Sequence, residues 1–437
     1  MTKPANHICM VGMGYIGLPT ATVFALRSIQ VLGLDIDEEA VAAINRGETH
    51  IVEPGLDDAV RRTVDAGYLR ASTVPEPADV FLIAVPTPFK NDGAGVEPDL
   101  SYIKSAALKI APVLKAGDVV ILESTSPVGA TEQMAEWLAT ARPDLTFPQS
   151  HGEASDIRIA HCPERILPGH ALEELVSNDR IIGGMTAACA ARTRKVYKLV
   201  VDGDCIETDC RTAELAKLTE NSFRDVNIAF ANELSLICDK LDINVWELIR
   251  LANRHPRVNI LQPGPGVGGH CIAVDPWFIV ASAPEEARMI RTAREVNDAK
   301  PEWVLAKVHQ AVAEHALHAD SPAKIACFGL AFKPNIDDLR ESPALNIATQ
   351  LGNIYPSNLF VVEPFVRSLP IDLEGKAKLV RASEAINASD IIVMLVDHDD
   401  FKAMPVPKRD DLAIIDTRGI WSGLRHLSRF QCSGLER

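Results

Sequence analysis

A glycine motif close to the N-terminus constrains the fold of this chain more than any other feature. An apolar run over residues 7–11 leads into Gly12-Met13-Gly14-Tyr15-Ile16-Gly17, a helical stretch through Leu26, and a second apolar run from residue 30 to Asp35. This order of strand, glycine turn, helix and strand is typical of a dinucleotide-binding βαβ unit. Gly12 permits the tight turn, Gly14 lets a pyrophosphate approach the backbone, and Gly17 lets the helix pack on the strand. The motif therefore predicts a Rossmann-like domain.

The acid that ends the second run indicates which dinucleotide binds. Asp35 can accept hydrogen bonds from the adenosine ribose, while the helix N-terminus offers amides and a partial positive charge to the phosphates. Asp37 and Glu38 follow with no arginine or lysine close by, so a 2′-phosphate would meet only negative charge. We expect NAD as the cofactor rather than NADP. The alternative is a glycine-rich turn that binds no ligand.

Strand-like and helix-like segments alternate through two parts of the chain. Further apolar runs cover 80–85, 119–122, 157–161 and 180–182, and a second series covers 324–328, 358–362, 391–396 and 412–416. Between the two series, helical patterns begin near residue 211 and also fill 245–253 and 284–315. Strands that alternate with helices predict doubly wound sheets.

The predicted fold class is α/β, with two Rossmann-like doubly wound domains joined by a long-helix connector domain. We place the NAD-binding domain at residues 1–208, the central helical domain at 209–317 and the C-terminal Rossmann-like domain at 318–437.

The composition narrows the function classes. A net charge of −15 argues against a general nucleic-acid or membrane-surface binder, although local basic residues can still hold an anionic small molecule. The nine cysteines are scattered without a CxxC pair, so neither a disulfide framework nor a metal site is expected. Because there is no signal-peptide pattern and no apolar run long enough to span a membrane, we expect a cytoplasmic protein.

A second glycine-rich segment carries a cysteine. From Pro263 to Pro276 the sequence reads Pro-Gly-Pro-Gly-Val-Gly-Gly-His-Cys-Ile-Ala-Val-Asp-Pro, which places Asp275 four residues after Cys271. Glycines let a backbone approach a ligand closely, and a thiol there can add to an electrophilic carbonyl. Beside a nicotinamide, this combination indicates oxidation beyond the aldehyde. A buried structural cysteine in a tight turn is the alternative.

One face of the predicted long helix is polar. Lys217, Asn221 and Arg224 are spaced at i, i+4 and i+7 and therefore share a face, while an apolar stripe lies elsewhere on the helix. The polar face is thus available to line a cleft, with an ordinary solvated surface as the alternative. The stripe consists of Phe223, Val226, Phe230, Leu234 and Ile237.

Two short segments follow predicted strands, where α/β folds place ligand groups. Cys162-Pro163-Glu164-Arg165 follows the run at 157–161. Phe332-Lys333 follows the run at 324–328, with Asp337, Asp338 and Arg340 close behind. Taken alone, each segment can also be a surface charge cluster.

Together these segments resemble the UDP-glucose/GDP-mannose dehydrogenase family over essentially the whole chain and in the family's order. The resemblance rests on Gly-Gly-His-Cys271 with Asp275, Lys217-x-x-x-Asn221, Pro163-Glu164-Arg165 and Phe332-Lys333. It implies NAD-dependent, four-electron oxidation of a sugar C6 alcohol to a carboxylate through a cysteine thiohemiacetal and thioester, with two NAD reduced per sugar. It also implies that residues 318–437 bind a UDP-sugar and that 209–317 carry the catalytic cysteine loop and an oligomer interface.

Within the family, three segments resemble the branch that oxidises UDP-N-acetyl-D-mannosamine and makes the uronic acid of bacterial surface polysaccharides such as enterobacterial common antigen. They are residues 123–129, 255–260 and the cysteine loop continued to Phe278, residues 263–278. Family members often carry Asn-Pro-Glu-Phe where this chain has Cys162-Pro163-Glu164-Arg165. Arginine at that place fits the branch that uses N-acetylated sugars.

The resemblance implies a role for each matching residue. Cys271 is the expected nucleophile, Lys217 exchanges a proton or stabilises an oxyanion, and Asn221 donates to that same oxygen. The remaining expected catalytic residues act on the hydrolytic water or its surroundings and are Asp275, Glu164 and Thr125. The expected cofactor contacts are Gly12, Gly14, Tyr15, Ile16, Gly17, Asp35, Thr87, Thr131 and Arg340. The expected substrate contacts are Arg165, Ile166, Lys217, Asn221, Arg224, His255, Arg257, Gly268, Phe332, Lys333 and Arg418. Whether lysine, glutamate or water is the base in each step stays open.

Three alternatives stay open. The nearest is oxidation of another nucleotide sugar, UDP-N-acetylglucosamine or UDP-glucose. A two-electron β-hydroxyacid-type dehydrogenase shares the first domain but needs neither a reactive cysteine nor a second Rossmann-like domain. A non-catalytic nucleotide-sugar sensor would keep the fold.

The expected partners are a UDP-sugar and further copies of the same chain. The resemblance implies at least a dimer, because Arg257 can reach a neighbouring subunit's site in this family. No nucleic acid, membrane or metal is expected.

Overall fold

The computed structural model describes residues 7–90, 97–166, 169–269 and 271–421, so His270 of the cysteine loop and Cys432 lie outside the described residues. The chain forms two compact units. The first comprises the chain up to residue 220 together with 278–284, and the second comprises 221–277 together with 285–437. The division into three domains at residues 208 and 317 stays a prediction.

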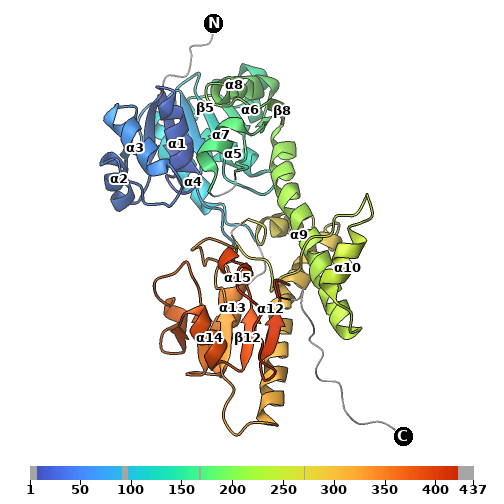
Figure 1. Cartoon of the computed structure of the whole chain (residues 1–437). Coiled ribbons are helices and arrows are strands. Elements are labelled where there is room, and N and C mark those ends of the chain that lie inside the picture. The colour runs from blue at the N-terminus through green and yellow to red at the C-terminus, as the bar shows by residue number, and fades with distance from the viewer. Residues whose placement is uncertain (1–6, 91–96, 167–168, 270, 422–437) are drawn as a thin grey trace. The chain divides into compact units, whose positions relative to one another are not determined.

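The first unit is built on an eight-stranded sheet (Figure 1). Its strand order is β3-β2-β1-β4-β5-β6-β7-β8, and neighbouring strands are parallel except β6 with β7. The chain crosses to the other side of β1 between β3 and β4, so β1 and β4 flank the switch point at which such sheets bind ligands. The strands are β1 (His7–Val11), β2 (Gln30–Leu34), β3 (Leu69–Ser72), β4 (Val80–Ile83), β5 (Val119–Leu122), β6 (Arg158–His161), β7 (Arg180–Gly184) and β8 (Cys205–Asp209).

The central strands β1, β2, β4 and β5 are buried on both faces of the sheet, which explains why they are continuously apolar. Alternate side chains of β1 enter different cores: Ile8 and Met10 pack on one face, and Cys9 and Val11 on the other. The first core contains α1 (Gly17–Leu26), α3 (Leu56–Asp65), α7 (Ala171–Ser177) and α8 (Ala187–Tyr197). The second contains α4 (Ser101–Ile110) and α5 (Ala130–Ala141). The short helices α2 (Glu38–Asn45) and α6 (Pro148–His151) complete the unit.

The second unit contains a five-stranded parallel sheet of the same topology. Its order is β11-β10-β9-β12-β13, so the switch point lies between β9 and β12. The strands are β9 (Ile325–Phe328), β10 (Leu359–Val362), β11 (Ala377–Leu379), β12 (Ile391–Met394) and β13 (Ala413–Asp416). One face packs against α12 (Arg288–Ala316) and α13 (Pro343–Ile354), and the other against α14 (Ala382–Ala388) and α15 (Asp399–Lys402).

These two sheets confirm the predicted α/β class with two doubly wound, Rossmann-like folds. Each predicted strand is present to within two residues. The strands β3, β8 and β11 were not predicted, because they are only partly buried and therefore lack a continuous apolar run. The helical segments predicted at 245–253 and 284–315 correspond to α10 (Val245–Ala252) and α12, and a further short helix, α11 (Asp275–Ser282), follows the cysteine loop.

The predicted long helix is α9 (Cys210–Lys240), which Figure 1 shows as one uninterrupted helix. Its apolar stripe does not face the core: Phe223, Phe230 and Ile237 are 70%, 55% and 44% exposed. The opposite side is buried and carries polar side chains, among them Asp225 and Asn232. The helix therefore buries the side that its hydrophobic pattern would place in solvent.

A network of buried polar groups joins α9 to α12. Arg294 Nη1 lies 2.6 Å from Asp225 Oδ1, and the side chains of both residues are at most 2% exposed. Asn297 Nδ2 donates to the same carboxylate oxygen at 2.8 Å, and Asn232 Nδ2 donates to Asn297 Oδ1 at 2.9 Å. Because each partner is buried, removing one would leave another without its hydrogen bond.

Among the described residues, no helix combines the length and the apolar character needed to cross a membrane.

Replacing Asp225 with alanine is expected to lower the free energy of unfolding of the second unit by about 1–3 kcal/mol, because the buried groups of Arg294 and Asn297 would lose this carboxylate partner, while Arg294 keeps its second partner, Asp298. Denaturant titration followed by circular dichroism measures this change. The matched control is Glu247→Ala, which breaks the exposed Glu247–Arg250 pair and should cost far less. Equal losses in the two variants would contradict the account.

Candidate functional site

The glycine loop at the first switch point has the space that a dinucleotide needs. Gly12 has a φ of 89°, and a Cβ there would lie 2.5 Å from the carbonyl oxygen of Ala84 on the strand across the switch point. A Cβ on Gly17 would lie 1.7 Å from the carbonyl oxygen of Gly12. Around Gly14, by contrast, nothing lies within 4 Å of the Cβ position. Two glycines thus serve close packing, and the third leaves room for a pyrophosphate, as the sequence predicted.

Asp35 directly follows strand β2 and holds this loop. Its Oδ2 accepts the backbone N–H of Met13 at 2.7 Å, and its Oδ1 accepts the N–H of Asp37 at 3.0 Å. Each carboxylate oxygen has two lone pairs, so a ribose hydroxyl can still donate to Asp35. The residue therefore fixes the glycine turn and is available to the adenosine ribose. This geometry fits NAD.

The other predicted cofactor contacts differ in accessibility. Tyr15 is 45% exposed, and Ile16 is half-buried at the start of α1. Thr87 is half-buried, and its hydroxyl donates to the carbonyl of Thr125 at 2.6 Å. Thr131 is fully buried, and its hydroxyl donates to Glu214 Oε1 at 2.6 Å. A cofactor contact through the Thr131 side chain would therefore require that bond to be exchanged.

The segment after β6 places a charged pair in the interior. Glu164 is 6% exposed, its Oε2 lies 2.7 Å from Arg180 Nη1, and its Oε1 accepts the backbone N–H of Arg165 at 2.6 Å. The Arg165 side chain pairs with Glu220 at 2.7 Å, and Ile166 packs against the first core. The carboxylate of Glu164, a predicted catalytic residue, is thus held by the Arg180 guanidinium and by the backbone N–H of Arg165.

A second buried acid lies in the same region. Glu123 directly follows β5 and accepts a hydrogen bond of 2.6 Å from the hydroxyl of Tyr197. Burial and, to a lesser degree, the charge of Glu164 raise the pKa of Glu123 to about 7. The Arg180 guanidinium lies 5.5 Å from the centre of the Tyr197 ring.

Asn221 of α9 and the cysteine loop are connected by hydrogen bonds in the second unit. Asn221 Nδ2 donates to Asp275 Oδ2 at 2.5 Å. The backbone N–H of Asp275 donates to the carbonyl of Cys271 at 2.8 Å, which closes the turn before α11. Lys217 is half-buried one helical turn before Asn221 on the same face of α9. The predicted trio Cys271, Asp275 and Asn221 is therefore brought together.

Cys271 differs from the other described cysteines in its exposure to solvent. Of the eight described cysteines, Cys271 is exposed and the other seven are buried. Burial raises the pKa of Cys9, Cys162 and Cys327 to about 12, which makes their thiolates scarce. Among the described cysteines, Cys271 is thus the one that a substrate can reach.

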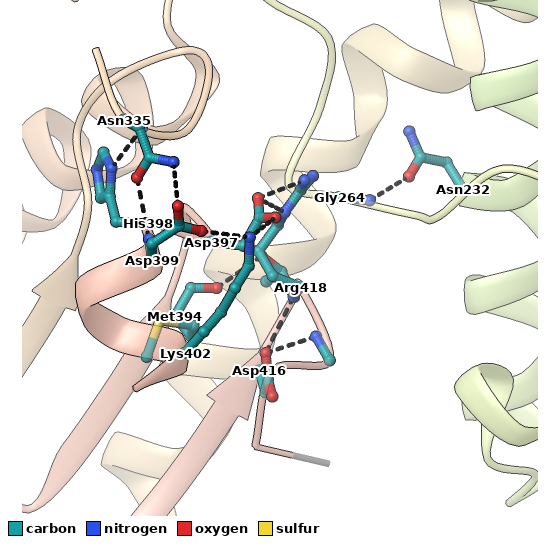
Figure 2. Close-up of polar contacts among 12 residues, drawn as sticks. Asn232, Gly264, Asn335, Met394, Asp397, His398, Asp399, Lys402, Asp416 and Arg418 are labelled. Atoms are coloured by element: carbon teal, nitrogen blue, oxygen red, sulfur yellow. Dashed lines mark hydrogen bonds and ion pairs between the residues drawn. The ribbon is translucent and has the colours of Figure 1, made fainter. Parts of the chain in front are cut away.

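The cysteine loop packs closely between α9 and the second sheet. The backbone N–H of Gly264 donates to Asn232 Oδ1 at 2.9 Å, which extends the buried network of α9 into the loop (Figure 2). A Cβ on Gly264 would lie 2.6 Å from Arg418 Nη1, and a Cβ on Gly268 would lie 3.0 Å from the Cβ of Phe332. Glycines are needed because the chain passes this close to its neighbours.

A small pocket lies at the second switch point. The loops that follow β9, β12 and β13 line it, together with the cysteine loop, at the carboxyl ends of the strands. Its lining includes Pro265, Gly266, Phe332, Asp397 and Arg418. Lys333, half-buried, follows Phe332 in the same loop. The predicted substrate residues Gly268, Phe332, Lys333 and Arg418 thus belong to one region.

Arg418 is the main cation of this pocket. Its Nη2 lies 2.6 Å from Asp397 Oδ1, and Lys402 Nζ lies 3.2 Å from Asp397 Oδ2 (Figure 2). Burial by itself would raise the pKa of Asp397, but the charges and hydrogen bonds of Arg418 and Lys402 together outweigh it, so that the pKa is lowered. An incoming phosphate can compete with Asp397 for these cations.

The acid at the end of β10 differs from its counterpart Asp35. Glu363 is 4% exposed, and its Oε2 accepts the N–H groups of Leu330 and Ala331 and lies 3.1 Å from His398 Nε2. The loop after β9, the N–H of Phe365 and a histidine therefore enclose this carboxylate. At this position the second sheet therefore has an internal anchor in place of a ribose-binding acid.

The remaining predicted residues lie at the surface. Arg224, His255 and Arg257 are exposed, and the backbone N–H of Arg257 donates to His255 Nδ1 at 3.4 Å. Arg340 is exposed and pairs with Asp338 at 2.6 Å. Within the described part of the chain, no cluster of histidine, cysteine and acidic residues could hold a metal ion.

Sequence reasoning missed several residues that hold the site. They are Glu123, Arg180, Tyr197, Asn232, Glu363, Asp397 and His398. Glu363 could have been found, because it follows the second strand of the second series as Asp35 follows the second strand of the first. The others pair over long sequence separations, for which a single sequence carries no signal.

Family models match along nearly the whole chain. Residues 6–201 match the NAD binding domain of the UDP-glucose/GDP-mannose dehydrogenase family, 211–299 its central domain, and 326–423 its UDP binding domain.

Individual relatives are also similar over nearly their full length. A UDP-N-acetyl-D-mannosamine dehydrogenase of Salmonella typhi is 62% identical over 417 residues, covering 95% of this chain and 99% of that protein. An NDP-N-acetyl-D-galactosaminuronic acid dehydrogenase of Ralstonia nicotianae is 62% identical over 418 residues, covering 96% and 97%. Among solved structures, a UDP-D-ManNAc dehydrogenase of Pyrococcus horikoshii has a TM-score of 0.83 at 38% identity, covering 95% of this chain and 96% of that one.

Replacing Asp35 with alanine is expected to weaken NAD binding by about 10- to 100-fold, because a charged hydrogen bond to the ribose and the anchor of Met13 are both lost. Isothermal titration calorimetry with NAD measures the affinity. Asp37→Ala is the control, since Asp37 caps α2 through the N–H groups of Glu39 and Ala40 and should leave the NAD affinity nearly unchanged. Unaltered affinity in Asp35→Ala would remove this residue from the cofactor site.

Proposed function

Because the chain belongs to the UDP-glucose/GDP-mannose dehydrogenase family, we propose that it oxidises the C6 alcohol of UDP-N-acetyl-D-mannosamine to the carboxylate of UDP-N-acetyl-D-mannosaminuronate. NAD is the cofactor, and two NAD are reduced per sugar. The observation that carries the proposal is the exposure of Cys271 beside Asn221 and Asp275, in a chain 62% identical to an enzyme of that name.

Cys271 acts as the nucleophile. Bound NAD supplies the hydride acceptor for each oxidation. The thiolate of Cys271 adds to the aldehyde carbon and gives a thiohemiacetal, whose oxidation gives a thioester. Water then adds to the acyl carbon, the carbon–sulfur bond breaks, and the carboxylate and the thiol are released. Because the aldehyde is bound covalently to Cys271, the half-oxidised sugar need not leave the enzyme between the two oxidations.

The polar face of α9 serves the reacting oxygen. Asn221 donates a hydrogen bond to it, and its amide is held ready by the 2.5 Å bond to Asp275. Lys217, on the same face, supplies or removes a proton or stabilises the negative oxygen. Asp275 orders the hydrolytic water or tunes Lys217, and Thr125 and Glu164 surround that water.

The second switch point holds the nucleotide-sugar. Arg418 and Lys333 face the diphosphate, and Phe332 and Gly268 offer an apolar surface and a backbone contact. The position of this pocket at the carboxyl ends of parallel strands supports the assignment. The sugar contacts are completed by Arg165, Ile166, Arg224, His255 and Arg257, while Arg340 projects toward NAD.

A second candidate substrate is the corresponding galactosamine derivative. The Ralstonia nicotianae relative, named for N-acetyl-D-galactosaminuronic acid, is as similar to this chain as the Salmonella typhi enzyme. The two sugars share the acetamido group and the C6 alcohol and differ in configuration at C2, which carries the acetamido group, and at C4, which carries a hydroxyl. A steady-state comparison of UDP-N-acetyl-D-mannosamine, UDP-N-acetylgalactosamine, UDP-N-acetylglucosamine and UDP-glucose separates the candidates. The proposal expects the highest kcat/KM for the mannosamine derivative and fails if another sugar is preferred.

The exposed stripe of α9 is the contact to a second copy of the chain. Phe223, Phe230 and Ile237 are exposed along one side of the helix, and Leu241 continues the stripe at 60% exposure. A continuous apolar face of this kind is rare on a monomer, and a two-fold axis can bury it against itself. We place the enzyme as a homo-oligomer, at least a dimer, in which Arg257 reaches the neighbouring site.

The cytoplasm is the proposed compartment, because NAD and nucleotide sugars are made and used there. The product is a precursor of a bacterial surface polysaccharide of the enterobacterial common antigen type.

Replacing Cys271 with serine is expected to abolish acid formation, because an alcohol is a far weaker nucleophile than a thiolate. Chromatography of the nucleotide-sugar products measures the acid, and calorimetry with UDP serves as the control that the pocket remains intact. Acid production at the wild-type rate would refute the thioester route.

Replacing Phe230 with glutamate is expected to shift the protein from oligomer to monomer, because a charge would be buried at the contact. Light scattering coupled to size-exclusion chromatography reports the mass. Leu317→Glu, at a position 79% exposed outside the stripe, is the matched control and should keep the oligomer. A Phe230→Glu variant of undiminished mass would place the contact elsewhere.

A further inference from the structure

His398 is a fully buried histidine beside the pocket of the second sheet. It lies between β12 and α15, and its side chain is 0% exposed. The ring packs against Phe365 and Phe401, with centroids 5.0 and 5.2 Å away. A phenylalanine could fill this space without polar atoms that need partners, so packing alone does not explain a histidine here. Its ring nitrogens therefore have a use of their own.

Both ring nitrogens make hydrogen bonds, and these fix the tautomer. The backbone N–H of Asn335 can only donate, and it lies 2.9 Å from His398 Nδ1 (Figure 2). Nδ1 is therefore the acceptor, and the ring proton lies on Nε2, which is 3.1 Å from Glu363 Oε2. His398 is thus a neutral ring that accepts from one segment and donates to another.

Glu363 continues this connection to the start of the loop after β9. Its Oε2 also accepts the backbone N–H groups of Leu330 at 2.7 Å and Ala331 at 3.2 Å. Burial by itself would raise the pKa of Glu363, but the hydrogen bonds from His398 and from backbone N–H groups outweigh it, so that the pKa is lowered. The carboxylate is therefore ionised and can bind all of these donors.

The other end of the loop is held at Asn335. Besides the bond to His398, the Asn335 side chain donates to Asp399 Oδ2 at 2.8 Å and accepts the N–H of Asp399 at 3.0 Å (Figure 2). Asn335 has a φ of 63°, a conformation that asparagine adopts more readily than most residues. Residues 332–334 thus lie between two fixed points, which leaves them few conformations.

We propose that His398 is a positioning residue that fixes Phe332 and Lys333 for the nucleotide diphosphate. It acts through its Nδ1 bond to Asn335. The inference rests on the proposed function, in which the second switch point holds the nucleotide-sugar. Phe332 lines the pocket there together with Arg418. A loop that is ordered before the ligand arrives loses less entropy on binding. Without the Nδ1 bond, binding weakens while the chemical steps are unchanged.

The test replaces His398 with asparagine and with glutamine, because each amide reproduces one ring nitrogen. Asparagine Oδ1 can accept from Asn335 as Nδ1 does, and glutamine Nε2 can donate to Glu363 as the ring Nε2 does. Isothermal titration calorimetry measures the affinities for UDP and for NAD. We expect His398→Asn to bind UDP within about threefold of the wild type and His398→Gln to bind it about tenfold more weakly, because only glutamine leaves the Asn335 N–H without an acceptor. The NAD affinity should not change in either variant.

Kinetics and hydrogen exchange separate this role from a purely structural one. With UDP-N-acetyl-D-mannosamine, the KM of His398→Gln should rise about tenfold while kcat stays within about twofold, as expected when ground state and transition state lose the same interaction. Amide exchange in a peptide that covers residues 330–336 should become faster in the glutamine variant and stay slow in the asparagine variant. A general loss of stability would instead affect both variants and the whole unit.

His309→Gln is the matched control. His309 is a half-buried histidine of the same unit, and its Nδ1 is hydrogen-bonded to the Tyr355 hydroxyl at 2.7 Å. Tyr355 precedes β10, so this pair lies at the amino ends of the strands, opposite the switch point. This variant should bind UDP as the wild type does.

Two results would overturn the inference. One is that His398→Gln binds UDP as well as His398→Asn does. The other is that either variant loses NAD binding or the circular dichroism of the wild type, because His398 would then support the fold as a whole. If the wild-type protein itself does not bind UDP, the proposed function fails at this pocket, whatever the variants show.

Discussion

The cysteine loop depends on two hydrogen bonds from α9. Asn232 accepts the N–H of Gly264 at the start of the loop, and Asn221 donates to Asp275 at its end. Between them lies a glycine-rich segment whose backbone loses much conformational entropy when it is ordered. One helix thus fixes both ends of the segment that carries Cys271. Because Asn232 also joins the buried network of Asp225 and Arg294, the polar core of α9 is tied to the position of the thiol.

Two sheets of the same topology perform different tasks because their loops differ. In the first, Asp35 anchors Met13 but keeps lone pairs for a ribose, and Gly14 leaves space for a pyrophosphate. In the second, Glu363 is enclosed by two backbone N–H groups and His398. The ligand groups there come from the loops after β12 and β13, where Asp397 and Arg418 lie. The fold provides a switch point in each case, and local side chains decide what it binds.

The sequence predicted the features that follow from local patterns. The strand–glycine–helix unit, the position of Asp35 and both sheets could be predicted, because continuous apolar runs and glycine spacing report buried parallel strands directly. The buried side of α9 could not be predicted from the sequence. Phe223 and Phe230 suggested an apolar core contact, whereas Asp225 and Asn232 face inward because α12 supplies matching Arg294 and Asn297. The pairing of Arg180 with Glu164 likewise depends on how β6 and β7 meet.

The central claim is that Cys271 captures a half-oxidised sugar and carries it through a second oxidation. The most direct measurement is the number of NADH formed per UDP-N-acetyl-D-mannosamine consumed, with the sugar limiting and NAD in excess, followed by absorbance at completion. The account predicts two NADH for each sugar and the uronic acid as the product. One NADH for each sugar, with an aldehyde or ketone as the product, would contradict it.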